Sequence, residues 1–372
     1  MTAAPVDKPG AVPLATVKAL AVRELHKFPE FNGAIPTSPT PLYFPDGRLA
    51  AYEFRMVKNG KTIGYIIVSA NRNLPPAILE AGFGEKTPSD LMKELAVKKG
   101  VKNYRLAYFS GLNYGILAGD KVVDMKGKEY RKPEKYVLQT GAYASSWDTA
   151  GQYTIQAATL VDQKVLWNIP RWTESDPSGG SWAGYDYIGP NADPWDKWDG
   201  CAPIAASMVI GYYETQYQTD WYKEAVIDIL HYLMGTSASG WTPTSNIGPG
   251  IERFYDRALY LYNEGVLSDP PHYKYTTSTI DNPSNSLLFT YVQLEIKSKR
   301  PLLLTASAAW GIGFEWSGSL HTTTVVGYSV YDNGEKYLYI HTTYDDPYSA
   351  WVLLDSIGSV RTLTMINPVK VS

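Results

Sequence analysis

The chain carries its only cysteine in the stretch DGCAPIAASM, residues 199–208. After the cysteine the residues continue in a helical pattern, with Ala205, Met208 and Tyr212 on one face. A glycine before Cys201 and a helix after it place the thiol at a helix N-terminus, where the macrodipole favours the thiolate. The stretch therefore predicts a nucleophilic thiol. The alternative is a buried structural cysteine.

A thiol nucleophile needs an imidazole nearby to ionise at neutral pH. The segment LHTTTVVGY, residues 320–328, offers one in His321, which opens a strand-like run. The distance along the chain lets a helix carrying Cys201 and a sheet carrying His321 form separately and meet at a cleft. No two histidines have metal-ligand spacing, so no zinc site is expected.

The pattern on both sides of the cysteine predicts an α+β fold, with helices first and an antiparallel sheet after them. Besides the helix after Cys201, helices are predicted at 251–262 and 286–296. The predicted strands are 302–306, 322–328, 337–341, 351–354 and 361–366.

A second, smaller α+β unit is predicted before residue 140. A helix at 17–28 precedes strands at 49–57 and 62–70, which Asn59-Gly60 joins in a hairpin. A further helix begins near Ser89 as its N-cap, and strands follow at 104–109 and 114–118. The polar segment that comes next sets the domain boundary. We expect a first domain at 1–140, a linker and possible processing region at 141–165, and a second domain at 166–372.

The two motifs resemble those of papain-like cysteine peptidases, closest to the branch of double-glycine leader peptidases. That branch reads Asp-Gly-Cys-Gly-Pro-Thr around its nucleophile and His-x-x-x-x-x-Gly-Tyr around its base. The helix, proline and strand at Gln293–Leu304 also match. The likeness covers about residues 165–370 and implies a papain-like fold with Cys201 as nucleophile and His321 as base.

The resemblance also implies a residue that orients the histidine and a donor for the oxyanion. Aligned on Tyr344, Thr342 takes the orienting place, where the family has Asn or Asp; His341 and Asp345 are rivals. The family's oxyanion hole joins the cysteine backbone N–H to a Gln shortly before the cysteine, and here no Gln occurs between Lys164 and Thr215. The candidate substitutes are the side chains of Trp195, Trp198 and Asn191.

Three carboxylates gather shortly before the cysteine. Asp193, Asp196 and Asp199 lie in a turn-rich stretch of the oxygen-rich kind that calcium favours. Their spacing matches no EF-hand, so an acidic surface loop is the preferred interpretation. No cofactor is expected otherwise.

The first domain carries a resemblance of its own. The stretch GYIIVSANRNLPPAIL, residues 64–79, is similar to the pro-domain of streptopain-type peptidases. This likeness implies a folded prosegment that covers the active site. The alternative is an unrelated substrate-binding or adhesion domain.

Charge is unevenly distributed along the 372 residues. Residues 1–135 carry 21 Lys+Arg and 13 Asp+Glu, a balance of +8, and the remainder carries −11, within a net charge of −3. The basic residues are spread through a folded unit, so we expect docking on the acidic domain rather than a nucleic-acid partner. No apolar run is long enough to span a membrane.

These observations predict a secreted, zymogen-type cysteine endopeptidase that is latent until the first domain is released. The alternatives are an inactive papain-like binding module at a cell surface and a cysteine amidase acting on small amides. An extracellular or cell-surface location is inferred from the prosegment and from the truncated-looking start at Met1; no signal peptide is present in the chain.

Overall fold

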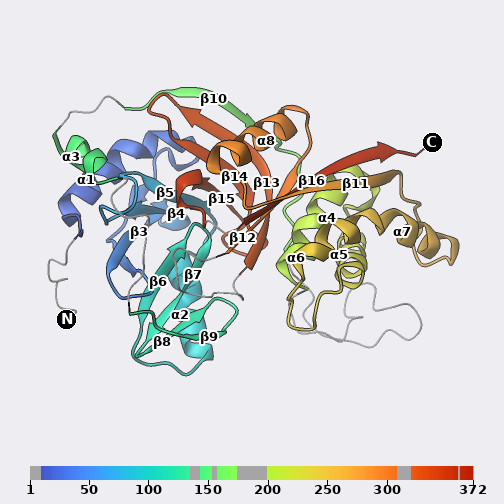
Figure 1. Ribbon diagram of the computed structural model, residues 1–372, viewed down its shortest axis with the longest axis horizontal. Helices are drawn as coiled ribbons and strands as arrows, with labels where there is room; N and C mark the ends of the chain where they lie inside the picture. The colour runs from blue at the N-terminus through green and yellow to red at the C-terminus, as the bar shows by residue number, and fades with distance from the viewer. Residues whose placement is uncertain are drawn as a thin grey trace.

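The computed structural model describes residues 10–134, 143–152, 157–173, 199–307, 320–358 and 361–371. It contains 32% helix and 34% strand, which confirms the expectation of a mixed α+β protein. We call residues 10–134 the N-terminal region and residues 157–371 the C-terminal region. Figure 1 shows the N-terminal region in blue and cyan at one end and helices α4 to α7 at the other, with strands between them.

The N-terminal region is a mainly antiparallel sheet with one parallel pair of strands, and two helices pack against it. Its helices are α1 (Leu14–Glu24) and α2 (Pro88–Lys98). Its strands are β1 (Ile35–Pro36), β2 (Thr40–Tyr43), β3 (Leu49–Lys58), β4 (Lys61–Ser69), β5 (Ile78–Phe83), β6 (Arg105–Ser110), β7 (Asn113–Ala118), β8 (Lys121–Asp124) and β9 (Glu129–Arg131). The predicted hairpin is confirmed: β3 pairs with β4, and Asn59 and Gly60 have φ of 51° and 77°.

The predicted N-cap of α2 was wrong by two residues. Thr87 caps the helix and forms a capping box with Asp90, whose carboxylate accepts the Thr87 N–H at 3.0 Å. Ser89 cannot serve, because its hydroxyl donates to the buried Glu53 carboxylate at 2.6 Å.

The segment expected as a linker contains regular structure. Helix α3 (Ala144–Gln152) and strand β10 (Leu160–Val165) fall within it. β10 pairs antiparallel with a strand of the C-terminal region, β13, from Leu160 opposite Tyr331 to Val165 opposite Gly327. The end of this segment is therefore part of the C-terminal sheet.

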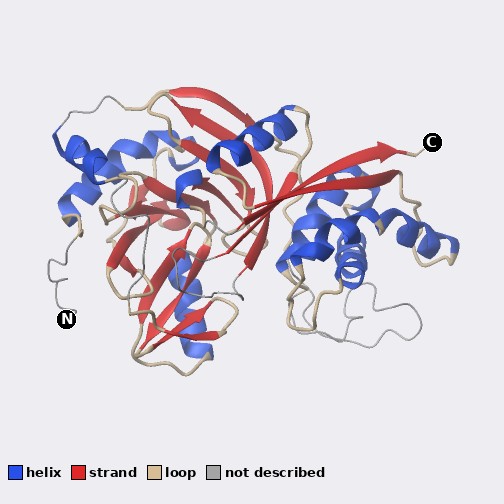
Figure 2. Cartoon of the chain, in the orientation of Figure 1, coloured by secondary structure: helices blue, strands red, loops and turns tan. Residues whose placement is uncertain are grey.

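The C-terminal region places a group of helices beside the other half of the sheet (Figure 2). The predicted helix at 251–262 is divided at Arg253, and helix α5 and strand β11 were not expected. The helices are α4 (Cys201–Tyr213), α5 (Asp220–Met234), α6 (Thr244–Glu252), α7 (Phe254–Asn263) and α8 (Asn285–Lys297). The strands are β11 (Tyr273–Asp281), β12 (Leu302–Ser307), β13 (Leu320–Tyr331), β14 (Lys336–His341), β15 (Ser349–Leu353) and β16 (Arg361–Lys370).

One sheet runs through both regions. Within the described residues its order is β11-β16-β12-β13-β14-β15-β5-β4-β3-β2-β6-β7-β8-β9, with β1 beside β3 and β10 beside β13. The regions meet where β15 pairs antiparallel with β5, from Ser349 opposite Phe83 to Val352 opposite Glu80. Aromatic contacts reinforce this junction, including Phe83 on Tyr339 with ring centroids 6.2 Å apart.

Helix α4 is the central helix of the C-terminal region. It packs between α5 and strands β12 and β13, and its residues from Cys201 to Gly211 are buried. In the described parts of the chain, no helix combines the length and apolar character needed to cross a bilayer.

Candidate active site

Cys201 is the first residue of α4, and the backbone before it has a conformation that requires glycine. Gly200 has φ of 96°, and a Cβ there would lie 2.7 Å from the carbonyl oxygen of Gly240. Gly200 has no side chain to cap the helix, and the N–H groups of the first turn point toward this end of α4. Cys201 therefore lies where the helix dipole stabilises a thiolate.

Strand β13 holds α4 in place through two hydrogen bonds. The Thr324 hydroxyl donates to the Ala205 carbonyl oxygen at 2.8 Å, and the Thr322 backbone N–H donates to Cys201 Sγ at 3.3 Å. The strand that carries His321 thus contacts the thiol directly, and the cysteine and histidine motifs come together at the N-terminus of α4.

The ring of His321 is fixed on two sides. Its Nε2 lies 2.8 Å from the carbonyl oxygen of Thr342, and its face stacks on Tyr344 with centroids 4.8 Å apart and planes 10° apart. Because a carbonyl oxygen only accepts, Nε2 carries the proton, and in the neutral ring Nδ1 is then the basic nitrogen. Nδ1 is buried and has no partner of normal hydrogen-bond geometry among the described residues.

The environment of Cys201 lowers its pKa to about 6. Burial is the largest influence and raises the pKa, but it is outweighed by the Lys126 charge, by hydrogen bonding and charge from His321, and by the Thr322 N–H. This influence of His321 acts without a hydrogen bond of normal geometry, since Nδ1 has no such partner among the described residues. Cys201 and His321 are each only 5% exposed.

The orienting candidates lie in different surroundings. Thr342 faces His321 through its backbone carbonyl, whereas its hydroxyl, the group expected to act, donates to the Pro347 carbonyl oxygen. His341 Nδ1 lies 2.8 Å from the Ser349 hydroxyl, and burial lowers its pKa to about 3. Asp345 is exposed. The structure therefore brings only the backbone of Thr342 to the ring.

Several predicted residues fall outside the part of the chain that the structure describes. These are the oxyanion candidates Asn191, Trp195 and Trp198 and the calcium candidates Asp193 and Asp196. The third calcium candidate, Asp199, is buried, and its carbonyl oxygen lies 2.8 Å from His231 Nδ1. Over the described ranges, no group of three or more His, Cys, Asp or Glu is arranged to hold a metal ion.

Two turns of the N-terminal region reach the site. Lys126 Nζ, between β8 and β9, donates to the Leu320 carbonyl oxygen at 3.0 Å. The turn between β6 and β7 is tied to the C-terminal region by the Gly111 N–H, which donates to the Ser356 carbonyl oxygen at 2.8 Å. Residues 111–113 and His321 line the same small void. These contacts were not predicted from the sequence.

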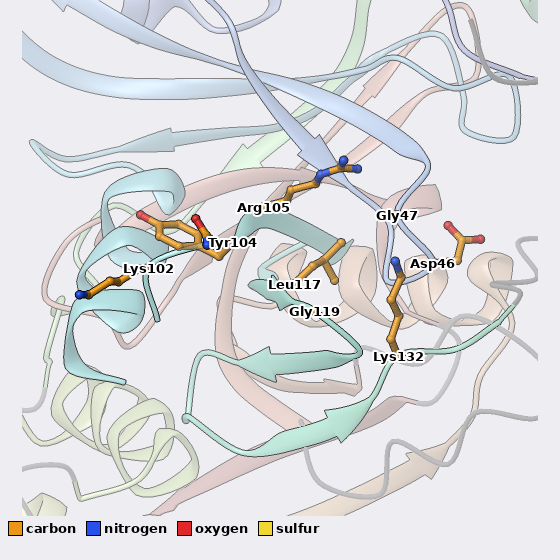
Figure 3. Close-up of a pocket in the computed structure, with 9 residues that line it drawn as sticks. Asp46, Gly47, Lys102, Tyr104, Arg105, Leu117, Gly119 and Lys132 are labelled. Carbon is orange, nitrogen blue, oxygen red and sulfur yellow. The ribbon is translucent and has the colours of Figure 1, made fainter. Parts of the chain in front are cut away.

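A larger cavity, of about 610 Å³, lies elsewhere in the N-terminal region (Figure 3). Its lining is polar and includes Lys102, Arg105 and Lys132, with Asp46 at one side. None of its lining residues takes part in the contacts around Cys201 and His321 that are described above. It is separate from the candidate active site.

A comparison with protein-family models finds no match for this chain, and a comparison with curated proteins finds no similar sequence.

Proposed function

We propose that this protein is a papain-like cysteine peptidase whose N-terminal region keeps it latent. One observation carries the proposal: β13 presents the His321 ring beside a thiol of lowered pKa. The residue after His321 donates its N–H to Cys201 Sγ, and Nε2 of the ring faces the Thr342 carbonyl oxygen. An inactive binding module has no need of an ionised thiol, so this feature favours an enzyme.

The reaction follows from the two side chains. The Cys201 thiolate attacks the carbonyl carbon of the scissile bond, and the protonated Nδ1 of His321 gives its proton to the leaving amine. The acyl group stays on sulfur as a thioester. A water molecule then loses a proton to His321 and attacks the thioester, which releases the acid and the Cys201 thiolate and restores the thiolate–imidazolium pair.

The position of Thr342 supports the role of His321. A carbonyl oxygen that accepts from Nε2 fixes the ring plane and stabilises the imidazolium, as a carboxylate or amide oxygen does in other triads. A neutral carbonyl does so less strongly than a carboxylate.

Latency is proposed because the N-terminal region shares the sheet and covers the site. The β5–β15 ladder, the Lys126 contact and the Gly111 contact all connect it to strands or turns around His321. Cys201 and His321 are both buried in the intact chain, so a polypeptide substrate reaches the thiol only after a rearrangement, which we propose is movement of the N-terminal region.

The test is hydrolysis of casein by the intact chain and by the chain cut between residues 136 and 142. We expect the cut chain to be active and the intact chain to be nearly inactive. Cys201→Ala and His321→Ala, cut by the same added protease, are expected to lose activity about equally, because a dyad fails as a unit. Activity in cut Cys201→Ala within a few-fold of wild type would show that the proposal is wrong.

A further inference from the structure

The turn between β8 and β9 is rigidly built. The carboxylate of Asp124 accepts the Lys128 N–H at 2.9 Å, and its backbone carbonyl accepts the Gly127 N–H at 2.8 Å. Asp124 itself is buried. These bonds fix the backbone on both sides of Lys126, so the turn itself directs the Lys126 side chain toward β13.

Lys126 lies on the wall of a cavity between the two regions. The cavity has a volume of about 310 Å³. From the N-terminal region it is lined by Leu91, Lys98, Met125 and Lys126, and from the C-terminal region by Ser239, Thr343, Tyr344 and Asp345. Tyr344 separates this cavity from the His321 ring, on which it stacks. The ammonium group of Lys126 donates to the carbonyl oxygen of Leu320 at 3.0 Å, so it lies at the residue that precedes His321 on β13.

We infer that Lys126 is a positioning residue that, from the N-terminal region, holds Cys201 as a thiolate in the intact chain. The inference rests on the proposed function only in taking Cys201 as the nucleophile. The thiol proton passes to His321 Nδ1 or to water, and Lys126 neither gives nor takes a proton. Latency is then a matter of access: the N-terminal region closes the site over a nucleophile that is already ionised.

The charges around the thiol agree with this role. Of the influences that lower the Cys201 pKa, the Lys126 charge is the largest, ahead of both contributions from His321. Lys126 is exposed, so salt screens its effect.

The other titratable groups on elements packed around Cys201 do not supply this charge. Burial lowers the pKa of His231, on α5, to about 4, so its ring is neutral when the thiol ionises. Burial raises the pKa of Tyr344, so its hydroxyl stays protonated. Asp199, just before α4, carries a negative charge when it is ionised and then opposes the thiolate.

The experiment uses the intact chain. Because the protein has one cysteine, labelling cysteine with ¹³C at Cβ gives a single resonance whose shift follows ionisation of Cys201. We expect Lys126→Met to raise the midpoint of this titration by about one pH unit, the size expected for loss of a nearby opposite charge. Lys126→Arg keeps the charge and is expected to stay near wild type. Lys98→Met removes a charge from the same cavity and is expected to shift the midpoint much less.

A second measurement covers the case in which Lys126→Met disturbs docking of the region. In the wild-type chain, raising the salt from about 0.05 M to about 1 M is expected to raise the midpoint, because screening weakens an exposed cation. An unchanged midpoint in Lys126→Met, or a wild-type midpoint that does not respond to salt, overturns the inference. Either result leaves the proposed function intact. If instead the midpoint rises in Lys126→Met but the cut wild-type chain hydrolyses nothing, the proposed function is wrong and this inference stands.

Discussion

At the scale of single residues, the acidity of Cys201 is decided by a competition. Burial disfavours the thiolate, and two charges and two hydrogen-bond donors favour it. Each favourable group comes from an element other than α4, so the thiol is activated when β13 is in place beside it, and the turn after β8 lowers its pKa further in the intact chain.

The backbone at Gly200 gives a first prediction. Gly200→Ala is expected to lower the free energy of unfolding by about 3 kcal/mol, because a Cβ is disfavoured at this φ and meets a backbone oxygen that cannot move aside. Gly265→Ala is the matched control, since Gly265 also has positive φ, at 75°, but open space around it, and is expected to cost about 1 kcal/mol. Urea denaturation measures both, and equal losses would contradict the argument from the clash.

The orienting role of the Thr342 backbone gives a second prediction. Thr342→Val removes the hydroxyl bonds to Pro347 and Tyr344 and is expected to cost about 1–3 kcal/mol of stability. It keeps the carbonyl that faces His321, so kcat/KM of the cut chain is expected to change less than about five-fold. Thr342→Ser is the control that retains both bonds. A loss of about a hundred-fold in Thr342→Val alone would show that the hydroxyl orients the ring.

The sequence motifs predicted that Cys201 and His321 lie close together, but not which other groups contact them. Cys201 and His321 stand in patterns with a chemical meaning, so their proximity could be anticipated. The Thr322 N–H and the Thr342 carbonyl are backbone groups that every residue carries, and Lys126 is one of many lysines. Only the folded geometry distinguishes them.

At the scale of elements, β5 connects the two regions and carries a buried carboxyl. Glu80 accepts hydrogen bonds from the hydroxyls of Tyr65 and Tyr114 and from the Leu112 N–H. Burial outweighs these donors and, with the charge of Glu53, raises the pKa of Glu80 to about 7. The same strand pairs with β15, so this carboxyl lies at the junction.

This raised pKa gives a third prediction, for stability against pH. Between its ordinary value near 4.5 and about 7, Glu80 is protonated in the folded chain and ionised in the unfolded one. In this range the folded state therefore binds more protons than the unfolded state. The free energy of unfolding is highest below pH 4.5 and falls by on the order of 3 kcal/mol as the pH rises through 7. The wild type is expected to lose this stability relative to Glu80→Gln across that window in urea denaturation. Parallel curves for the two chains would contradict it.

Elements with a strong local pattern were predictable, and others were not. The β3–β4 hairpin has Asn-Gly at its turn, and α8 and β12 to β16 have apolar cores. β11 is an edge strand of mainly threonine, serine and tyrosine, whose stability comes from pairing with β16, distant in the sequence. β5 follows a turn with two prolines, and it is held in the sheet by pairing with β15 on one side and β4 on the other.

At the scale of the whole molecule, the charge asymmetry and the shared sheet act on different steps of docking. The opposite charges of the two regions attract at long range, whereas the β5–β15 ladder and the aromatic contacts form at short range. Long-range attraction is screened by salt, and backbone pairing and apolar burial are not.

The fourth prediction follows for the chain cut between residues 136 and 142. Raising the salt from about 0.05 M to about 0.5 M is expected to slow association of the two parts several-fold and to change their dissociation rate little. Surface-immobilised C-terminal region with the N-terminal region in solution gives both rates. A dissociation rate that rises steeply with salt would show that ion pairs, rather than the ladder, hold the regions together.

Alkylation of Cys201 as a function of pH measures whether His321 activates the thiol. The rate of reaction of Cys201 with iodoacetamide is followed from about pH 4 to pH 10 in the cut chain and in its His321→Ala variant. We predict a midpoint well below the value near 8.5 of an ordinary thiol, and a midpoint that moves toward that value when the imidazole is removed. Alkylation that begins only above about pH 8 in both chains would show that His321 does not activate the thiol.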